Sequence, residues 1–385
     1  SSQEYTPAGQ LITLEVHNPY GDISIQGGDQ ELINMRLHTS AGGPSAEIAQ
    51  ETLDKIDLEV LESSEKIIIR VKYPDAEVNG HIQADLIFEV PAKINLLIQG
   101  GSGNVTASRI QGAVTISNDF GNVQLDDIQS GAVEISSQNG MIEVQNIRAS
   151  EQAVTLSSQF GSLKLARVAA KTLTADTKNG ELSASDINVS GQTELSSDFG
   201  TITLRGGKSG GLKAQSQNGI ISVQGLTLSA DLLAYSDFGN VEISQAYAPR
   251  YDLQSKNGSI TLNGADQAAI SALTDFGSIE IRNAKSAQLN LETKSGLVQF
   301  YGSLSNSEHL LRTSFGDIRL RLPSNQPLNL DLNTGFGVIQ SEFELTTSQP
   351  AQEKHWQGSI NGGGGLLTVQ TENGSITLEK SISEE

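Results

Sequence analysis

The sequence predicts an all-β fold, a single-stranded parallel β-helix or β-solenoid whose coils of about 20 residues stack on one another. The first observation behind this prediction is a short phrase around glycine that recurs about every 20 residues. Its glycines stand at positions 121, 140, 161, 180, 200, 219, 239, 258, 277, 296 and 316. The second is that each unit holds two short stretches in which apolar and polar residues alternate, such as 114–117 and 123–128. One unit cannot bury its apolar row alone, whereas stacked units form a continuous core.

Composition is the third observation. Charged residues make up 18% of the chain, below the roughly 25% of ordinary globular domains, and 39 glycines supply tight corners. Lys and Arg number 25 against 45 Asp and Glu, a net charge of −20, which disfavours binding to nucleic acids and anionic membranes. The absence of cysteine excludes disulfides, thiolate metal sites and cysteine nucleophiles.

An antiparallel meander of hairpins is the competing fold, because Asn-Gly between alternating runs is a strong hairpin signal. Phenylalanine, however, precedes glycine at every second corner, and it suits a positive φ poorly. These phenylalanines are Phe120, Phe160, Phe199, Phe238, Phe276 and Phe315. A coil of about 20 residues places them at every second level, about 9.6 Å apart, with each ring covering the small corner of its neighbour. A coil of about 39 residues instead stacks Phe on Phe. We favour the shorter coil.

The chain divides into three regions by regularity. Residues 1–100 are predicted to be N-terminal strands and a β-rich cap leading into the solenoid, with a short helix near 45–55 whose N-cap is Ser45. Residues 101–322 are the regular repeats. Residues 323–385 are irregular C-terminal coils and a cap, with the stretch 366–378 as the final coil.

No apolar run approaches the roughly 20 residues of a membrane-spanning helix. The sequence begins Ser-Ser-Gln-Glu with no initiator Met and no apolar leader. We interpret it as a mature or trimmed chain, in which a secretion signal, if there was one, is not shown.

The repeated unit Ser-x-Asn/Phe-Gly-x-Ile-x-Leu and the closing run at 362–378 resemble the bacterial "putative adhesin" family of β-strand repeats, catalogued as a domain of unknown function. The segments 14–25 and 88–91 fit the same resemblance, which covers about 11–378. It implies an exported, envelope-associated β-solenoid and brings no catalytic residues with it.

The Asp-Phe-Gly triplets are similar to the magnesium-binding triplet of protein kinases, but no glycine-rich phosphate loop with a paired lysine accompanies them. We interpret their aspartates as corner residues. A calcium-binding column is the alternative for Asp119, Asp198, Asp237 and Asp275, although the Gly-Gly-x-Gly-x-Asp pattern of calcium rolls is missing.

A polysaccharide lyase or a pectinase-like enzyme is the alternative function, since such enzymes share the β-helix. That chemistry needs clustered carboxylates beside a basic residue. The acids here are spread over the outward rows, as are the arginines: Glu134, Glu143, Glu194, Glu242, Glu280, Arg148, Arg167, Arg205 and Arg282. The five histidines (His17, His38, His81, His309, His355) show no ligand spacing. We therefore predict no catalytic, cofactor-binding or metal-ligating residues and no cofactor.

The predicted function is a non-enzymatic exported β-solenoid that acts as an adhesin or as a binding and scaffold protein of the cell envelope, in the periplasm, on the outer surface or secreted. Its expected partner is a surface glycan or an envelope protein, not nucleic acid, docking at the excursions 246–251, 301–309 and 346–358. A further alternative is an assembly module that oligomerises through its backbone edges. One set of aromatic residues could either form a patch that stacks on sugars or only fill space at corners and insertions: Tyr235, Tyr247, Tyr251, Phe300, Tyr301 and Trp356.

Overall fold

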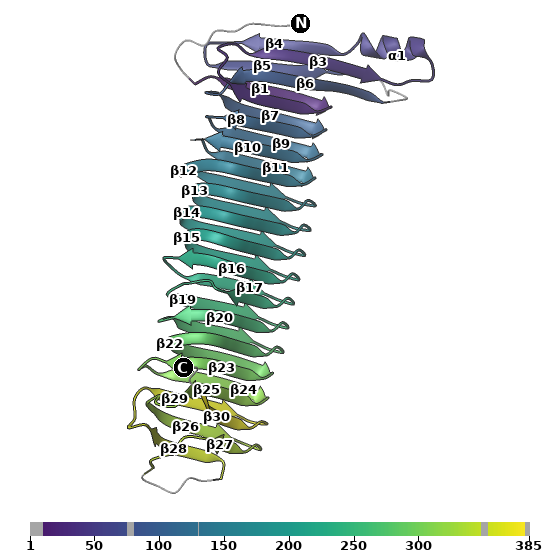
Figure 1. Ribbon diagram of the computed structural model, residues 1–385. Coiled ribbons are helices and arrows are strands. Elements are labelled where there is room, and N and C mark those ends of the chain that lie inside the picture. The colour runs from purple at the N-terminus through teal and green to yellow at the C-terminus, as the bar shows by residue number, and fades with distance from the viewer. Residues whose placement is uncertain (1–10, 75–80, 130, 348–352, 382–385) are drawn as a thin grey trace. The chain divides into compact units, whose positions relative to one another are not determined.

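The computed structural model describes residues 11–74, 81–129, 131–347 and 353–381. The chain divides into two compact units, residues 1–191 (unit 1) and 192–385 (unit 2). Each unit is a β-solenoid of stacked parallel coils (Figure 1), which confirms the predicted fold class. The division into 1–100, 101–322 and 323–385 stays a prediction.

One coil consists of two strands that belong to two facing sheets. In unit 1, β9 (Val114–Phe120) pairs in parallel with β7 (Asn95–Ser102) and β11 (Val133–Asn139). In that register Val133 lies opposite Val114, 19 residues earlier. The coil therefore holds about 20 residues, and the prediction of the shorter coil is confirmed.

Alternation along these strands builds the core. In β9 the side chains of Val114 and Ile116 are buried, whereas Thr115 and Ser117 between them face outward. The same inward positions in neighbouring coils carry Ile, Leu, Val or Ala. Similar side chains therefore stack from one coil to the next, and together they fill the space between the two sheets. Each buried aliphatic side chain contributes about 1.5–3 kcal/mol to stability.

The remaining strands of unit 1 are β1 (Thr13–Tyr20), β2 (Ile23–Gly28), β3 (Asn34–Ala41), β4 (Asp57–Glu62), β5 (Lys66–Lys72), β6 (Ile82–Pro91), β8 (Val105–Ile110), β10 (Val123–Gln129), β12 (Ile142–Ser158) and β13 (Leu163–Thr177). Strand β14 (Leu182–Ser197) runs past the end of unit 1.

The strands of unit 2 are β15 (Ile202–Ser216), β16 (Ile221–Leu228), β17 (Leu232–Ser236), β18 (Val241–Ser244), β19 (Arg250–Ser255), β20 (Ile260–Asp266), β21 (Ala269–Thr274), β22 (Ile279–Ser295), β23 (Val298–Leu304), β24 (His309–Phe315), β25 (Ile318–Pro323), β26 (Leu328–Thr334), β27 (Ile339–Ser341), β28 (His355–Ile360), β29 (Leu366–Thr371) and β30 (Ile376–Ser381).

The N-terminal end of unit 1 does not follow the sequence order. The coil made by β1 and β2 lies between β5/β6 on one side and β7/β8 on the other, all in parallel register. Two antiparallel strands lie outside this coil, with β4 on β5 and β3 on β6. They cover sheet edges that would otherwise invite another chain to pair.

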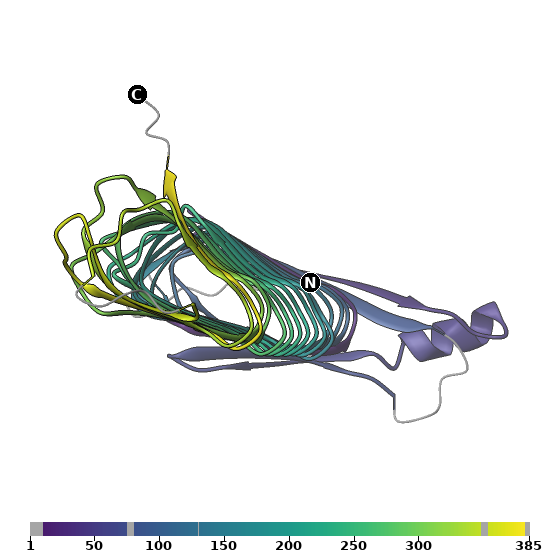
Figure 2. The same ribbon diagram turned by 90° about the horizontal axis from the view of Figure 1, so that it is seen from below.

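The helix α1 (Ala46–Leu53) belongs to this end of unit 1 and projects beyond the outline of its coils (Figure 2). Its predicted N-cap is confirmed, because the Ser45 hydroxyl accepts a hydrogen bond from the Ile48 N–H at 3.3 Å. Thr52 is buried on the side that faces the strands, whereas Ile48 is largely exposed.

The C-terminal end of unit 2 is also out of sequence order. Strand β29 lies between β24 and β26, and β30 lies between β25 and β27. The stretch predicted to form the final coil is thus inserted inside the stack. Antiparallel β28 pairs with β26 and supplies the edge there. The prediction of a terminal coil at 366–378 is wrong, because β29 and β30 each pair in parallel with a strand on both sides.

A left-handed residue recurs at one position of ten successive coils, from residue 109 to residue 283. Arg109, Asp127 and Asn146 have φ of 55°, 53° and 56°. Each follows an outward residue and precedes a buried one, so two successive side chains face outward before the alternation resumes. Equivalent residues are Arg167 and Asp186 in unit 1 and Gly206, Gly225, Gln245, Gly264 and Asn283 in unit 2. This bend was not predicted from the sequence.

Candidate functional site

The most regular feature of each unit is the corner that follows each strand of one sheet, with the pattern Ser/Thr-x-Phe/Asn-Gly. Its first residue is buried and joins two coils. In unit 2 the Ser255 hydroxyl accepts a hydrogen bond from Gly258 N–H in its own coil at 2.8 Å and donates one to Gly239 C=O in the preceding coil at 3.0 Å. Equivalent hydroxyls in both units repeat the contact to the preceding coil, at Thr177, Ser216, Ser236, Thr274, Thr293 and Thr313. This hydroxyl ladder satisfies backbone groups that would otherwise be buried without a partner.

Glycine and the residue after it complete the corner. A Cβ placed on Gly258 would lie 2.1 Å from the carbonyl oxygen of Gly239, so only glycine allows the coils this approach. Where the following residue is Asn or Ser, its side chain accepts a backbone N–H of the next coil, as from Ser259 to Asn240 Oδ1 at 3.0 Å and from Ser278 to Ser259 Oγ at 3.2 Å.

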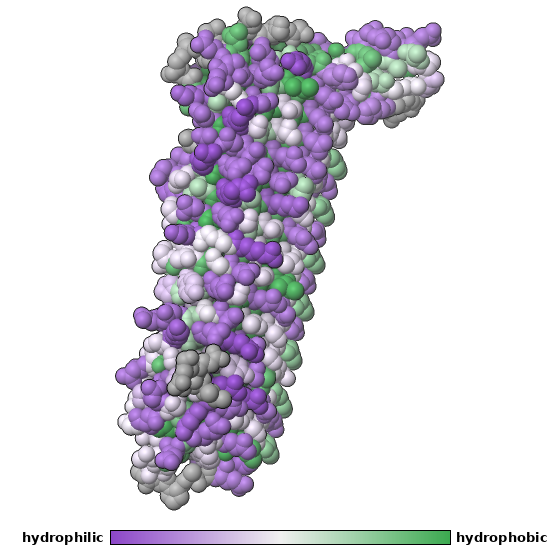
Figure 3. All heavy atoms as spheres, in the orientation of Figure 1, coloured by the Kyte–Doolittle hydropathy of each residue, from purple (hydrophilic) through white to green (hydrophobic). Residues whose placement is uncertain are grey.

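The residue before glycine is where the coils differ. We call its aromatic members in unit 2 the aromatic column: Phe199, Phe238, Phe276, Phe315 and Phe336. Their rings are 60–83% exposed, so they cover the neighbouring corners only in part. Figure 3 shows hydrophobic surface recurring along the edge at which these corners lie.

Aromatic and small corners alternate in space. Backbone hydrogen bonds join Asn218 N–H to Asp198 C=O, Phe238 N–H to Gln217 C=O and Asn257 N–H to Asp237 C=O, which sets the order of the corners. Beyond them Ser295 pairs with Phe315, and Asn373 N–H bonds to Ser314 C=O.

The inserted C-terminal coil preserves this alternation. Phe315 and Phe336 follow one another in the repeat along the sequence, yet Asn373 lies between them in the structure, since Phe336 N–H bonds to Glu372 C=O. Unit 1 shows the same order at its start, where Tyr20 pairs with Ser102 and Ser102 pairs with Phe120.

The aspartates beside the aromatic column have hydrogen-bond or ion-pair partners within the protein. Asp237 contacts Lys256 of the next coil at 2.5 Å, and Asp275 contacts Lys294 at 2.8 Å. The Lys256 ammonium and then the Tyr235 hydroxyl lower the pKa of the Asp237 carboxyl. Asp198 accepts from Gln217, and Asp119 in unit 1 accepts from Gln138. The aspartates considered for a calcium-binding column are therefore each bonded to a side chain of the protein.

The aromatic residues singled out from the sequence do not gather into one patch. Tyr251 and Phe300 are fully buried. Tyr301 lies between the guanidinium groups of Arg282 and Arg321, whose carbons are 5.1 and 5.4 Å from its ring centre. Exposure at the Asp-Phe-Gly phenylalanines went unrecognised in the sequence, where they were assigned to covering the corners.

The acidic and basic candidates are dispersed. Arg148 pairs with Asp127 at 2.8 Å, Arg282 with Glu280 at 2.5 Å, and Arg167 donates to the Asn146 side chain. His17 contacts Glu15, His355 contacts Asp331, and His309 is buried. Across the described residues, no group of three or more His, Asp or Glu side chains is placed to hold a metal ion.

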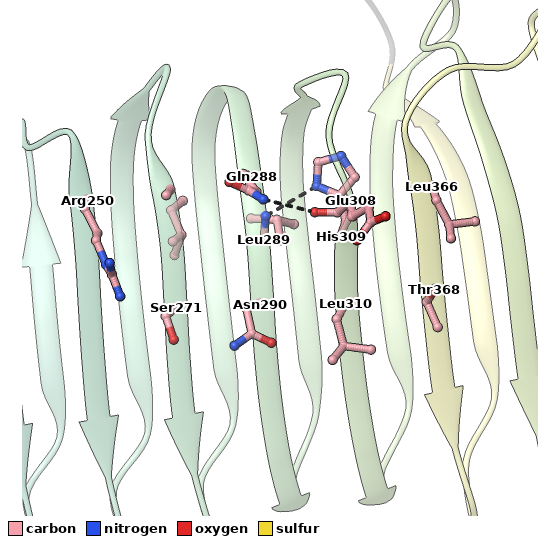
Figure 4. Close-up of a pocket in the computed structure, with 12 residues that line it drawn as sticks. Arg250, Ser271, Gln288, Leu289, Asn290, Glu308, His309, Leu310, Leu366 and Thr368 are labelled. Atoms are coloured by element: carbon pink, nitrogen blue, oxygen red, sulfur yellow. Dashed lines mark hydrogen bonds between the residues drawn. The ribbon is translucent and has the colours of Figure 1, made fainter.

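Hollows of different sizes open on unit 2. One of about 580 Å³ crosses the outward face of β19, β21, β22, β24 and β29, where the small residues Ala269 and Ser271 lie among larger ones (Figure 4). In Figure 4 Gln288 reaches toward the Glu308 carbonyl at 3.4 Å, and the His309 ring accepts from Leu289 N–H at 3.3 Å. This hollow overlaps the predicted docking excursion 301–309. Part of the excursion 346–358, residues 348–352, lies outside the described residues.

The second hollow, of about 440 Å³, lies beside the last ring of the aromatic column, Phe336. Polar side chains surround it, among them Arg312, Asn333, Gln370 and Asn373. Arg312 already donates to Gln370 Oε1 at 3.1 and 3.3 Å. An apolar ring with converging amide groups is an arrangement typical of small-ligand sites.

Comparison with known proteins places the chain in a family. A family model described as Toastrack DUF4097 matches residues 10–225 and again 201–379. No curated protein matches the chain. A "putative cell adhesion protein" from Clostridium sporogenes is 8% identical, with a TM-score of 0.22, covering 99% of this chain and 98% of that one. A "putative adhesin" from Bacteroides fragilis is 12% identical, with a TM-score of 0.28, covering 73% and 96%. At these scores neither likeness carries an argument about function.

Proposed function

The chain belongs to the Toastrack DUF4097 family, and from that membership and the geometry above we propose that it is a non-enzymatic, exported binding or adhesion scaffold of the cell envelope. The observation that carries this proposal is the exposed aromatic column. Its rings stand in water at a position where the same fold elsewhere uses asparagine or serine.

Exposure of these rings is unfavourable for an isolated protein. Burying a phenylalanine side chain contributes about 1.5–3 kcal/mol, and unit 2 leaves five such rings mostly in solvent. A regular row of exposed apolar groups with a polar rim is typical of an interaction surface. The proposed role is therefore to present this row to a partner.

The dispersal of acidic and basic side chains supports a role without catalysis. Hydrolysis or elimination at a sugar needs carboxylates close together with a raised or lowered pKa. Glu242 is instead the only acid of β18, and the two acids of β22, Glu280 and Glu292, lie twelve residues apart and pair with different arginines.

Export to the periplasm, the outer surface or the medium is part of the same proposal. A chain without cysteine suits an oxidising compartment, where free thiols would react. No helical segment of the described residues has the length and apolar character needed to cross a membrane.

Binding and turnover can be separated in one experiment. The purified chain is mixed with insoluble polysaccharides, with bacterial cell-wall sacculi and with protein-coated beads, then sedimented, and new reducing ends and unsaturated sugars are measured in the supernatant. We expect co-sedimentation with at least one surface and no released sugar. Released oligosaccharide, or no binding to any surface, would contradict the proposal.

A further inference from the structure

The fold itself gives no reason for the rings of the aromatic column. Phe238 and Asn257 occupy equivalent corners, and each donates its backbone N–H to the preceding coil at 2.9 Å. The ring is therefore not needed to close the turn. Stacking aromatic rings in every coil would stabilise a parallel array, yet the alternation with Asn257 and Ser295 prevents that contact.

The spacing of the rings is suited to a periodic ligand. Coils stack about 4.8 Å apart, so rings in alternate coils are about 9.6 Å apart. The length of one disaccharide in an extended β-1,4-linked chain is close to this spacing. The apolar face of a pyranose ring packs well on an aromatic face, and the Asn and Ser side chains of the intervening corners are able to hydrogen-bond with hydroxyl groups.

Electrostatics favour an uncharged partner over an anionic one or a second copy. Lys256 and Lys294 neutralise the aspartates beside Phe238 and Phe276, and Asp198 beside Phe199 keeps a negative charge. The chain carries a net charge of −20, which opposes both polyanions and self-association along this edge.

The hollow beside Phe336 lies at the last ring of the aromatic column, where one end of a bound chain would be held. Its aromatic wall and its polar rim of Arg312, Asn333 and Gln370 offer donors and acceptors close to an apolar surface. Arg312 faces Glu292 at 3.9 Å and donates to Gln370, and Glu372 also lines the hollow. The rim therefore suits hydroxyl groups better than a phosphate or a carboxylate.

We propose that unit 2 binds an extended, uncharged β-1,4-linked hexose polysaccharide along the aromatic column, with every second sugar lying on a phenyl ring. This inference rests on the proposed binding function and names its ligand class.

The test uses the full chain and titration calorimetry. The probes are cellohexaose and chitohexaose, with cellobiose as a ligand too short to reach two rings. Maltohexaose serves as a curved chain and polygalacturonate as an anionic one. Phe238→Asn and Phe276→Asn remove rings while installing the residue that neighbouring corners already use. Tyr247→Asn, which removes another exposed ring of unit 2 away from the column, is the matched control.

We expect one of the two hexaoses to bind, and cellobiose, maltohexaose and polygalacturonate to bind more weakly or not at all. Each Phe→Asn change is expected to weaken binding about 3- to 10-fold and the double variant at least about tenfold, with Tyr247→Asn unchanged. Unchanged affinity in the double variant, or no binding of either hexaose, overturns the inference. If the chain then still sediments with another surface, the proposed function stands without it. A wild-type dimer that the double variant converts to a monomer, or a loss of phosphatidylcholine-vesicle binding, would assign the column to self-association or to lipid instead.

Discussion

Replacement of one buried hydroxyl of the ladder should destabilise unit 2 far more than its size suggests. Ser255 is 4% exposed, and its hydroxyl is the partner of Gly258 N–H at 2.8 Å and of Gly239 C=O at 3.0 Å. Removing it leaves one buried donor and one buried acceptor without a partner. Each unpaired buried group lowers the free energy of unfolding by about 1–3 kcal/mol. The two together predict a loss of about 2–4 kcal/mol once the corner relaxes.

The comparison of Ser255→Thr with Ser255→Val isolates this effect, because the two new side chains have nearly the same shape. Threonine already occupies the ladder at position 274 and makes both bonds, to Gly258 C=O at 2.9 Å and from Gly277 N–H at 3.2 Å, so Ser255→Thr should change the free energy of unfolding by less than about 1 kcal/mol. Ser255→Val should carry the full loss. The free energy is obtained from urea unfolding followed by circular dichroism.

Ser271→Val is the control for the valine itself, because Ser271 is on the outward face of a neighbouring strand. It should shift stability by no more than about 0.5 kcal/mol. If Ser255→Val and Ser255→Thr unfold at the same urea concentration, the ladder does not stabilise the stack and the reasoning is wrong.

Three further predictions concern the backbone, the inserted coil and a buried histidine. Gly258→Ala should lower the free energy of unfolding by at least about 2 kcal/mol, because the new Cβ would meet the Gly239 carbonyl. Gly225→Asn should be tolerated, since Gly225 has φ of +66° and a Cβ there would lie at least 3.8 Å from every residue other than its two chain neighbours. Urea unfolding midpoints compare the two variants, and equal midpoints would refute the argument. Deleting residues 362–385 removes β29 and β30 from between their neighbours, so hydrogen exchange should show β26 and β27 losing protection, and retained protection would show that they stack without the inserted coil. Burial lowers the pKa of His309, and its neutral ring contacts Leu289 N–H and Ser305 C=O. The folded state therefore takes up a proton less readily than the unfolded state, and the free energy of unfolding should fall as pH drops below about 6.5. His309→Gln should flatten that dependence in urea titrations at several pH values, and an unchanged slope would assign it to other groups.

Much of the corner was open to prediction from the sequence. The glycine spacing, the alternating strands and the exchange of Phe for Asn are local signals, and they predict a coil of about 20 residues correctly. Ser45 as a helix cap is another local signal that the structure confirms. The exposure of the phenylalanines was not predicted, because a pattern of residue types does not say how far a ring stands out from its corner.

The left-handed bend shows a second reason why local sequence does not predict every feature of the backbone. Left-handed backbone at Asn146 or Gly225 fits the known preferences of those residues, but Arg109 and Arg167 occupy the same position with no such preference. The core requires the next side chain to point inward, and that demand overrides local tendency.

The sequence by itself determined the coil, its length and the residues of its corner, because these depend on contacts within about 20 residues and on identical contacts to any adjacent coil. Only the tertiary structure decided which coils are neighbours. Every coil offers the same backbone edge and the same buried rows, so the repeat allows a coil to stack next to many others. Insertion of the coil that carries Asn373 between those of Phe315 and Phe336 is such a choice. Covering the last sheet edge with β28 favours this order, and with it the even spacing of the aromatic column.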